Sequence, residues 1–140
     1  MILHIITAIF IFFAIIEQMK LYESAEDYLE RILILSNQLG KVRAIDIAKD
    51  MSFSKPSVSV AMHKLEDNGY IKIEADGSLV LTEKGRQVAE SVYERHLVLT
   101  KALVALGVSE EQAKIDACKV EHDISEETFS AIKKHVDGRK

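Results

Sequence analysis

The spacing of hydrophobic residues predicts a chain built mostly from helices. Within residues 22–38, apolar positions recur every three or four residues and form one face of a helix. Ser24 is the expected N-cap of this helix, with the acidic residues Glu26 and Asp27 in its first turn. Gly40 is expected to end it. The apolar face consists of Tyr28, Leu29, Ile32, Leu33 and Leu35.

A pair of shorter helices is predicted next. Residues 44–51 and residues 55–68 both have helical spacing, and a turn at residues 52–54 separates them. Ser54 is the expected N-cap of the second helix, and Pro56 fits its first turn, where no backbone N–H is needed. Two helices joined by a turn of this length are typical of a helix-turn-helix.

A β-hairpin is predicted directly after these helices. Residues 70–74 and residues 78–82 read as strands, and the connection between them contains the pair Asp76-Gly77. An Asp-Gly pair between two short strands is the strongest local signal of a tight hairpin turn. A helix-turn-helix followed at once by a hairpin predicts a winged helix.

The remainder of the chain is predicted to be helical. A long amphipathic helix over residues 83–106 is capped by Thr82 and ended by Gly107. Two shorter helices follow the expected N-caps Ser109 and Ser125, and they run to about residue 122 and to residue 136.

The predicted fold class is therefore mostly α, with two domains behind an apolar extension of residues 1–19. Residues 20–82 form the winged-helix domain, and residues 83–140 form an all-helical domain. The single cysteine, Cys118, excludes an internal disulfide and makes a stapled secreted domain improbable. The net charge of −4 argues against a nonspecific coat of nucleic acid, which would be basic, but it allows a local basic face.

The apolar extension has three open interpretations. Residues 1–16 carry no charged side chain, but a spanning helix needs about 20 apolar residues, and the basic start and cleavage site of a signal peptide are missing. The segment is an artefact of start-site choice, a membrane anchor, or an extra helix that packs on the protein or on a partner. We prefer the first interpretation, because the chain from Met19 onward reads as an ordinary soluble protein, and we exclude residues 1–19 from the functional interpretation.

The second helix of the helix-turn-helix carries polar and basic side chains near its N-terminus, the end that enters the major groove in this motif. Residues 41–72 contain six Lys or Arg and four Asp or Glu, so this region is positive although the chain is acidic. The alternative is a winged helix that binds protein through these solvated faces, but the order of elements favours DNA. The predicted DNA-binding residues are Lys41, Arg43, Ser54, Lys55, Ser57, Ser59, His63 and Lys64.

Metal-ligating side chains occur in three groups on separate predicted helices: two carboxylates three residues apart, one histidine in the long helix, and a Cys-x-x-Glu-His cluster on one face. Their convergence would supply about six donors, enough for one octahedral ion or a closely spaced pair, and these donor types suit Fe(II), Mn(II), Co(II) or Zn(II). Each residue also has an ordinary explanation, as an ion-paired carboxylate, a packed histidine or a small buried cysteine. The candidate ligands are Asp27, Glu30, His96, Cys118, Glu121 and His122.

Four segments in this order resemble the iron- and manganese-dependent (diphtheria-toxin-repressor-like) family, and especially its manganese transport regulators. They are residues 24–32 (SAEDYLERI), 79–85 (LVLTEKG), 95–96 (RH) and 118–125 (CKVEHDIS). The resemblance extends from residue 20 to about residue 137. It implies a homodimer with N-terminal winged helices and a helical metal-binding and dimerisation domain.

The resemblance also implies a hybrid metal site. All six candidate ligands match family ligand positions, but Cys118 is the residue usual in iron sensors, whereas Asp27 is the residue usual in manganese sensors. Iron sensors have an ancillary site, and its positions are occupied here by Thr100 and Lys114, neither of which fits. The SH3-like third domain of many iron sensors is also missing.

The implied function is a metal-dependent DNA-binding transcriptional repressor that senses Mn(II) or Fe(II) and controls metal-homeostasis genes from the cytoplasm. Its expected partners are a palindromic operator in double-stranded DNA and a second copy of the chain, without a small-molecule substrate. The alternatives are a metal-independent winged-helix repressor that responds to a small organic ligand and a regulator tethered to the membrane by residues 1–18. A metalloenzyme with Glu121 as base is disfavoured because saturated ligation leaves no open position, so we predict that the protein is not an enzyme.

Overall fold

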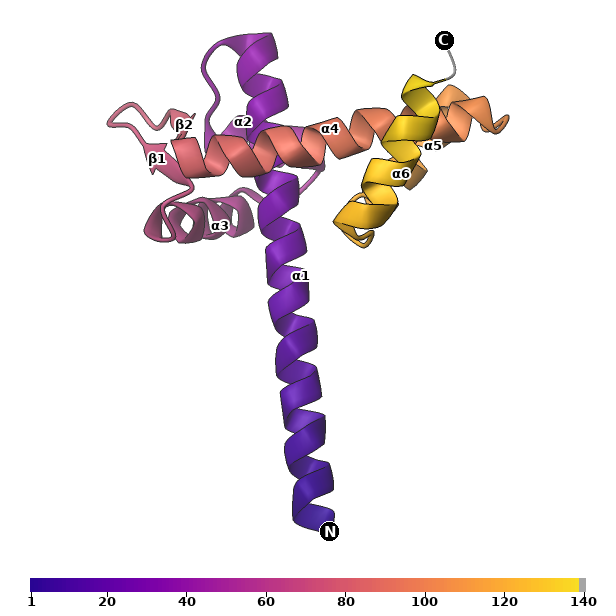
Figure 1. Cartoon of the computed structure of the whole chain (residues 1–140). Coiled ribbons are helices and arrows are strands. Elements are labelled where there is room, and N and C mark those ends of the chain that lie inside the picture. Colours follow the sequence, from indigo (N-terminus) through magenta and orange to yellow (C-terminus); the bar gives the residue numbers. More distant parts are fainter. Residues whose placement is uncertain (139–140) are drawn as a thin grey trace.

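The computed structural model of the chain describes residues 1–138, without the side chains of residues 20–22. The described residues form six helices and one two-stranded sheet, as Figure 1 shows. A winged-helix head and a small helical tail lie at the two ends of helix α4 (Glu83–Ala105), and the longer helix α1 (Ile2–Leu39) crosses it. The predicted class, mostly α with a winged helix followed by a helical domain, is confirmed.

The longest element, α1, runs without interruption from Ile2 to Leu39. The prediction that a helix starts at the N-cap Ser24 is therefore wrong, because Ser24 lies inside α1. No glycine or proline occurs before Gly40, so nothing in the local sequence breaks the helix between the apolar extension and the head. Gly40 ends α1 as predicted, with a φ of 80° that favours glycine.

The head contains the predicted helix-turn-helix and hairpin. Helix α2 spans Ala44–Met51 and helix α3 spans Lys55–Asp67, where the Ser54 hydroxyl accepts a hydrogen bond from the Ser57 backbone N–H. The antiparallel strands β1 (Ile71–Ile73) and β2 (Leu79–Leu81) form the wing and are slightly shorter than predicted. The buried core beneath them includes Leu29, Ile32, Ile47, Val58, Met62 and Ile71.

Helix α4, Glu83–Ala105, connects the head to the tail. It begins at the predicted N-cap Thr82 and packs on α1 as well as on the two tail helices (Figure 1). The tail helices are α5, Glu110–Val120, and α6, Glu126–Asp137, and serine side chains cap both as predicted. Because α1 supplies core residues to the head and also contacts α4, the head and the tail share one packed helix pair.

Candidate metal centre

The six candidate ligands lie in one place, where α1, α4 and the end of α5 meet. Helix α1 supplies Asp27 and Glu30, which are three residues apart and so face the same side. Helix α4 supplies His96. The last turn of α5 and the residues just after it supply Cys118, Glu121 and His122. Their donor atoms form two sets of three. Within each set, all donor atoms lie within 4.8 Å of one another, and Glu121 belongs to both sets.

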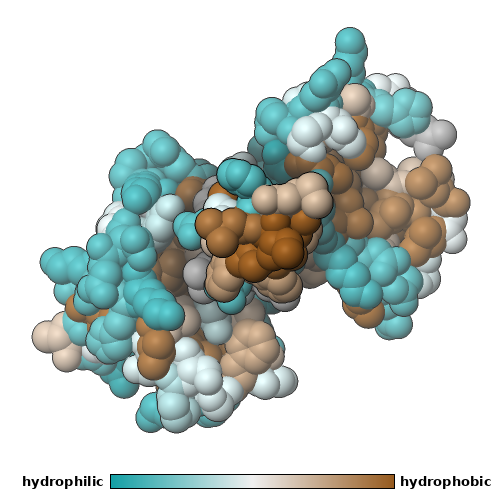
Figure 2. All heavy atoms as spheres, turned by 90° about the horizontal axis from the view of Figure 1, so that it is seen from below, coloured by the Kyte–Doolittle hydropathy of each residue, from teal (hydrophilic) through white to brown (hydrophobic). Residues whose placement is uncertain are grey.

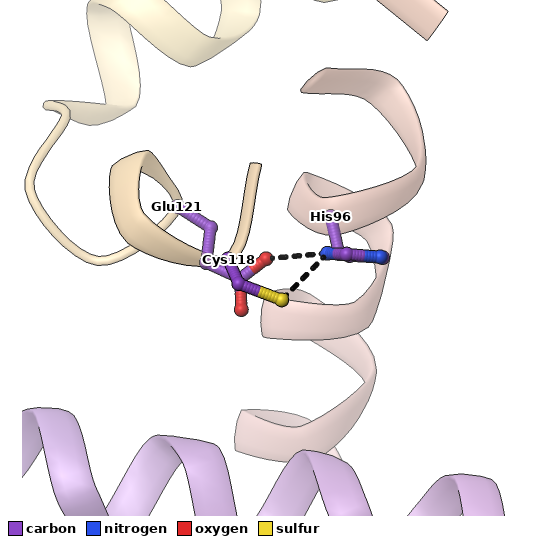
Figure 3. A group of neighbouring side chains, drawn as sticks. All are labelled: His96, Cys118 and Glu121. Carbon is purple, nitrogen blue, oxygen red and sulfur yellow. Dashed lines mark hydrogen bonds and ion pairs between the residues drawn. The ribbon is translucent and has the colours of Figure 1, made fainter. Parts of the chain in front are cut away.

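The first set consists of His96, Cys118 and Glu121 (Figure 3). The His96 Nδ1 atom lies 3.0 Å from a Glu121 carboxylate oxygen and 3.6 Å from the Cys118 sulfur. Both partners come from the end of α5 and point at the same ring nitrogen on α4. A cysteine sulfur, a carboxyl group and an imidazole are therefore gathered around one point, and these donor types suit a transition-metal ion.

The second set consists of Asp27, Glu121 and His122 and connects the tail to α1. The His122 Nε2 atom lies 2.7 Å from Asp27 Oδ1 and 3.5 Å from the second carboxylate oxygen of Glu121. The two oxygens of Glu121 therefore face different histidines, with Oε2 toward His96 and Oε1 toward His122. Glu121 joins the two sets into one continuous site.

Burial makes the carboxylates of this site unusual. Glu121 is 1% exposed and Glu30 is 4% exposed, and the two carboxyl groups lie close enough for each to shift the pKa of the other. A charged carboxylate in such surroundings is unfavourable unless a cation or a proton compensates it. The structure thus brings together all six residues that the sequence singled out, and it places the two buried carboxylates at the centre.

The electrostatics of the site follow from this crowding. Burial is the main cause that raises the pKa of Glu30 to about 8, and the interaction with the neighbouring Glu121 carboxyl group raises it further. Burial also raises the pKa of Glu121 to about 7. For His122, burial opposes the charged form, but the neighbouring Asp27 and Glu26 outweigh it and raise the pKa to about 10. The site therefore holds protons where a divalent cation would supply the same compensating charge.

Two buried polar atoms show that these residues fit a cation. Among the described side chains, Glu121 Oε1 and His122 Nδ1 are buried without a hydrogen-bond partner. Buried polar atoms are almost always hydrogen-bonded, so a buried carboxylate oxygen that makes no hydrogen bond at the centre of a donor cluster is suited to hold a cation. The mixture of oxygen, nitrogen and sulfur donors suits Mn(II), Fe(II), Co(II) or Zn(II).

Sequence reasoning missed two residues that support this site. Glu26, read as a first-turn charge, lies 3.8 Å from His122 Nδ1. Arg95 donates hydrogen bonds to the backbone carbonyls of Glu121 and Ile124, so it holds the turn that carries the α5 ligands. Glu26 lies four residues before Glu30, and this spacing placed it on the same helix face. The role of Arg95 left no signal in the sequence, because an arginine that binds backbone carbonyls needs no particular residue type as its partner.

The two residues at the ancillary-site positions make ordinary contacts. Thr100 donates a hydrogen bond from its hydroxyl to the His96 carbonyl one turn earlier. Lys114 pairs with Glu110 on the surface of α5. The absence of the ancillary site of iron sensors stays a prediction from the sequence.

The affinity for Mn(II) is expected to rise with pH. Metal binding requires ionised carboxylates and a neutral imidazole, so it must displace protons from Glu30, Glu121 and His122, whose pKa values are about 8, 7 and 10. All three pKa values are raised above the ordinary values of 4.5 and 6.5. Protons therefore stabilise the metal-free fold at low pH, and this contribution is lost as the pH rises through about 7 to 10.

Calorimetry of Mn(II) binding in buffers with different ionisation enthalpies measures the released protons directly. Urea unfolding of the metal-free chain across the same pH range checks the second trend. An affinity that does not change with pH, or binding without proton release, would contradict this account of the site.

The predicted DNA-binding residues lie on α3, at its N-cap and beside the wing. Ser54, Lys55, Ser57, His63 and Lys64 are exposed on α3, and Ser59 is half-buried. The remaining two lie beside the wing. There, Lys41 pairs with Asp76 at a distance of 3.2 Å, and Arg43 forms a β-bridge with Ser78. Val58, Met62 and Leu65 of α3 are buried, so the exposed polar side chains of α3 are free to approach a groove.

A winged-helix head joined through shared helices to a partly buried cluster of six side chains that could hold a metal ion defines a metal-dependent DNA-binding transcriptional regulator. Two sequence models of one family match the chain: "Iron dependent repressor, N-terminal DNA binding domain" at residues 20–79, and "Iron dependent repressor, metal binding and dimerisation domain" at residues 82–140. The chain belongs to the iron-dependent repressor family, as its resemblance implied.

Similar curated proteins include manganese-type regulators. The transcriptional regulator MntR of Escherichia coli O6:H1 is 35% identical over 111 residues, which are 79% of this chain and 72% of that protein. The HTH-type transcriptional regulator MntR of Geobacillus kaustophilus is 39% identical over 102 residues, which are 73% of this chain and 72% of that protein. These similarities support a repressor of metal-homeostasis genes rather than a repressor that senses an organic ligand.

Solved structures of similar fold include the manganese regulator SloR, with a TM-score of 0.72 and 29% identity. A manganese-dependent transcriptional repressor in complex with manganese has a TM-score of 0.72 and 27% identity. Each alignment covers 81% of this chain but only 53% and 52% of those chains. The chain thus spans about half the length of these solved regulators.

Proposed function

We propose that this chain represses metal-homeostasis genes when Mn(II) or Fe(II) is held by six donors. These donors are Asp27, Glu30, His96, Cys118, Glu121 and His122. The observation that carries the proposal is the buried Glu121 carboxylate, which is shared by both donor sets and has an oxygen without a hydrogen-bond partner among the described residues. Because both buried carboxyl groups, Glu30 and Glu121, belong to the proposed donor set, we infer a regulator without a small-molecule substrate and without catalysis.

The signal from this site reaches the head through α1. A bound divalent cation would compensate the carboxylates of the site and tie α1 to α4 and α5. Asp27 and Glu30 lie on the same helix as Leu29 and Ile32, which are fully buried in the core of the head. A change in the position of Asp27 and Glu30 relative to the tail therefore moves the head as a rigid body. A cation that binds one arrangement more tightly shifts the population toward it.

The proposed target is a palindromic operator read by two copies of the chain. In a dimer, the two α3 helices would enter successive major grooves about 34 Å apart. The polar and basic side chains exposed at the start of α3 support this assignment. The dimerisation domain that the family model assigns to residues 82–140 supports the second copy, and operator DNA places the working head in the cytoplasm.

The first experiment titrates Mn(II) and Fe(II), without oxygen, into the full chain and follows heat and stoichiometry. Tight binding of either metal, lost in a Cys118→Ala and His122→Ala double variant, supports the site and names its preferred ion. The matched control is Glu111→Gln, an exposed glutamate on α5 that should leave binding unchanged. If neither metal binds, the metal-independent repressor that responds to an organic ligand becomes the better account.

Replacing Lys55 and Lys64 by alanine is expected to weaken operator binding and its dependence on salt. Each lysine that contacts a phosphate contributes about 0.9 to the slope of log affinity against log salt concentration. The double variant should therefore lose nearly two units of slope for each copy bound. Fluorescence anisotropy at several salt concentrations measures the slope. The control Lys134→Ala changes an exposed lysine on α6, and an equal slope in both variants would remove α3 from the DNA interface.

A further inference from the structure

The first half of α1 projects from the molecule as an isolated rod (Figure 1). The described side chains of residues 1–19 are exposed, with the exception of the half-buried Ile16. Figure 2 looks at the molecule from below, and the end of this rod stands at the centre as a brown, hydrophobic cap. Large apolar side chains are thus held in water by a helix with nothing packed against it, which is costly for a soluble protein.

The rod is apolar on every side. Residues 10–13 are Phe, Ile, Phe and Phe, and consecutive residues of a helix point about 100° apart. Four large apolar side chains in a row therefore cover the full circumference. A packed partner helix, or a second copy of the rod, needs only one apolar stripe and would leave the other faces in water. A lipid environment covers all faces at once.

The length and composition of the rod match the interior of a bilayer. An 18-residue window has a mean hydropathy of 2.1, and none of its side chains is buried within the molecule. Residues 2–19 extend roughly 27 Å as a helix, against about 30 Å for the hydrocarbon core. The helix satisfies its own backbone groups, and the Thr7 hydroxyl donates to the Leu3 carbonyl at 2.8 Å, so little polarity is left to face lipid.

The distribution of basic residues fixes an orientation. No lysine or arginine precedes Lys20, so all 18 lie on one side of the rod. Basic residues stay on the cytoplasmic side of a spanning helix. This orientation puts the winged head beside the chromosome and the N-terminus outside. His4, the one ionisable side chain before Glu17, then lies near the outer interface.

We propose that residues 2–19 span a lipid bilayer and anchor the regulator to the membrane with its head in the cytoplasm. The family models match only from residue 20 onward, so the anchor is an addition to the sensor and goes beyond its proposed function. Sequence alone led us to set this segment aside. The structure adds that it continues α1 without a break and that its described side chains, apart from the half-buried Ile16, are exposed.

The full chain, expressed in bacteria, tests the anchor by membrane fractionation and carbonate extraction. The native chain should remain with the membranes. An Ile9→Arg and Phe12→Arg double variant should be released, because each arginine near the centre of a span lowers insertion by on the order of a hundredfold. The matched control is Leu39→Arg with Val80→Arg, two exposed apolar residues of the head, which should stay membrane-bound. Retained Mn(II) binding in each variant shows that the sensor is folded.

Three results would overturn the anchor. The native chain could stay in the soluble fraction, or carbonate could release it, or the two arginines could leave its association unchanged. A soluble oligomer that the same two arginines convert to a smaller species would instead show that copies of the rod cover one another. Protease added to spheroplasts tests the orientation, because a head digested from outside contradicts a cytoplasmic head.

Discussion

Glutamine in place of Glu121 is expected to lower the affinity of the chain for Mn(II) by more than about 100-fold. That figure is the upper end of the loss seen when only an outer-shell partner of a metal ligand is removed, and Glu121 is itself a candidate ligand. Its two carboxylate oxygens face His96 and His122 from one buried position, so the substitution affects both donor sets at once. Glutamine keeps the shape of the side chain and removes only its charge.

The same substitution should leave the metal-free fold intact and make it more stable above pH 7. Burial raises the pKa of Glu121, which shows that its ionised form is unfavourable in the metal-free site. Competition with a metal chelator measures affinity, and urea unfolding measures stability. The Glu111→Gln control should change neither. Normal Mn(II) binding by the Glu121→Gln variant would remove Glu121 from the site and with it the link between the two sets.

Alanine in place of Gly85 is expected to destabilise the chain by about 1–3 kcal/mol or more, as overpacking commonly does. A Cβ atom at this position would lie 1.9 Å from the Tyr70 carbonyl oxygen. That carbonyl cannot move aside easily, because it accepts hydrogen bonds from the backbone N–H and the hydroxyl of Thr82. The start of α4 therefore needs a glycine to lie against the strand that begins the wing.

Urea unfolding measures the loss of stability in the Gly85→Ala variant. Operator binding by this variant should also weaken, because α4 holds the wing in place. Ser91→Ala changes an exposed residue on the same helix and serves as the control, where a small gain in helix propensity is expected. Equal stability of the Gly85→Ala variant and the native chain would mean that the α4–wing contact is looser than the structure has it.

Local rules were sufficient for most of the fold. Ser54, Thr82, Ser109 and Ser125 cap helices where the sequence predicted, because an N-cap depends only on residues within one turn. Ser24 failed under the same rule. A serine signals a helix start only if the chain before it is not already helical, and the apolar extension contains nothing that stops a helix.

The candidate site was predictable in part. The i, i+3, i+4 spacing placed Cys118, Glu121 and His122 on one face, but spacing says nothing about which distant helix that face meets. The family resemblance supplied the meeting of α1, α4 and α5. The burial of Glu30 and the backbone contacts of Arg95 depend on tertiary packing, so they became visible only in the structure.

Because α1 is one continuous helix, an insertion has different consequences in its two halves. One inserted residue turns everything upstream by about 100°. Between Asp27 and Leu35 such a turn would carry carboxylates into the core and core residues into the metal site, so that register is locked. Upstream of Met19 the surface is apolar in all directions, and a turned helix presents the same surface. The apolar segment upstream of Met19 can therefore change its rotation without altering its surface, while α1 between Asp27 and Leu35 tolerates no insertion.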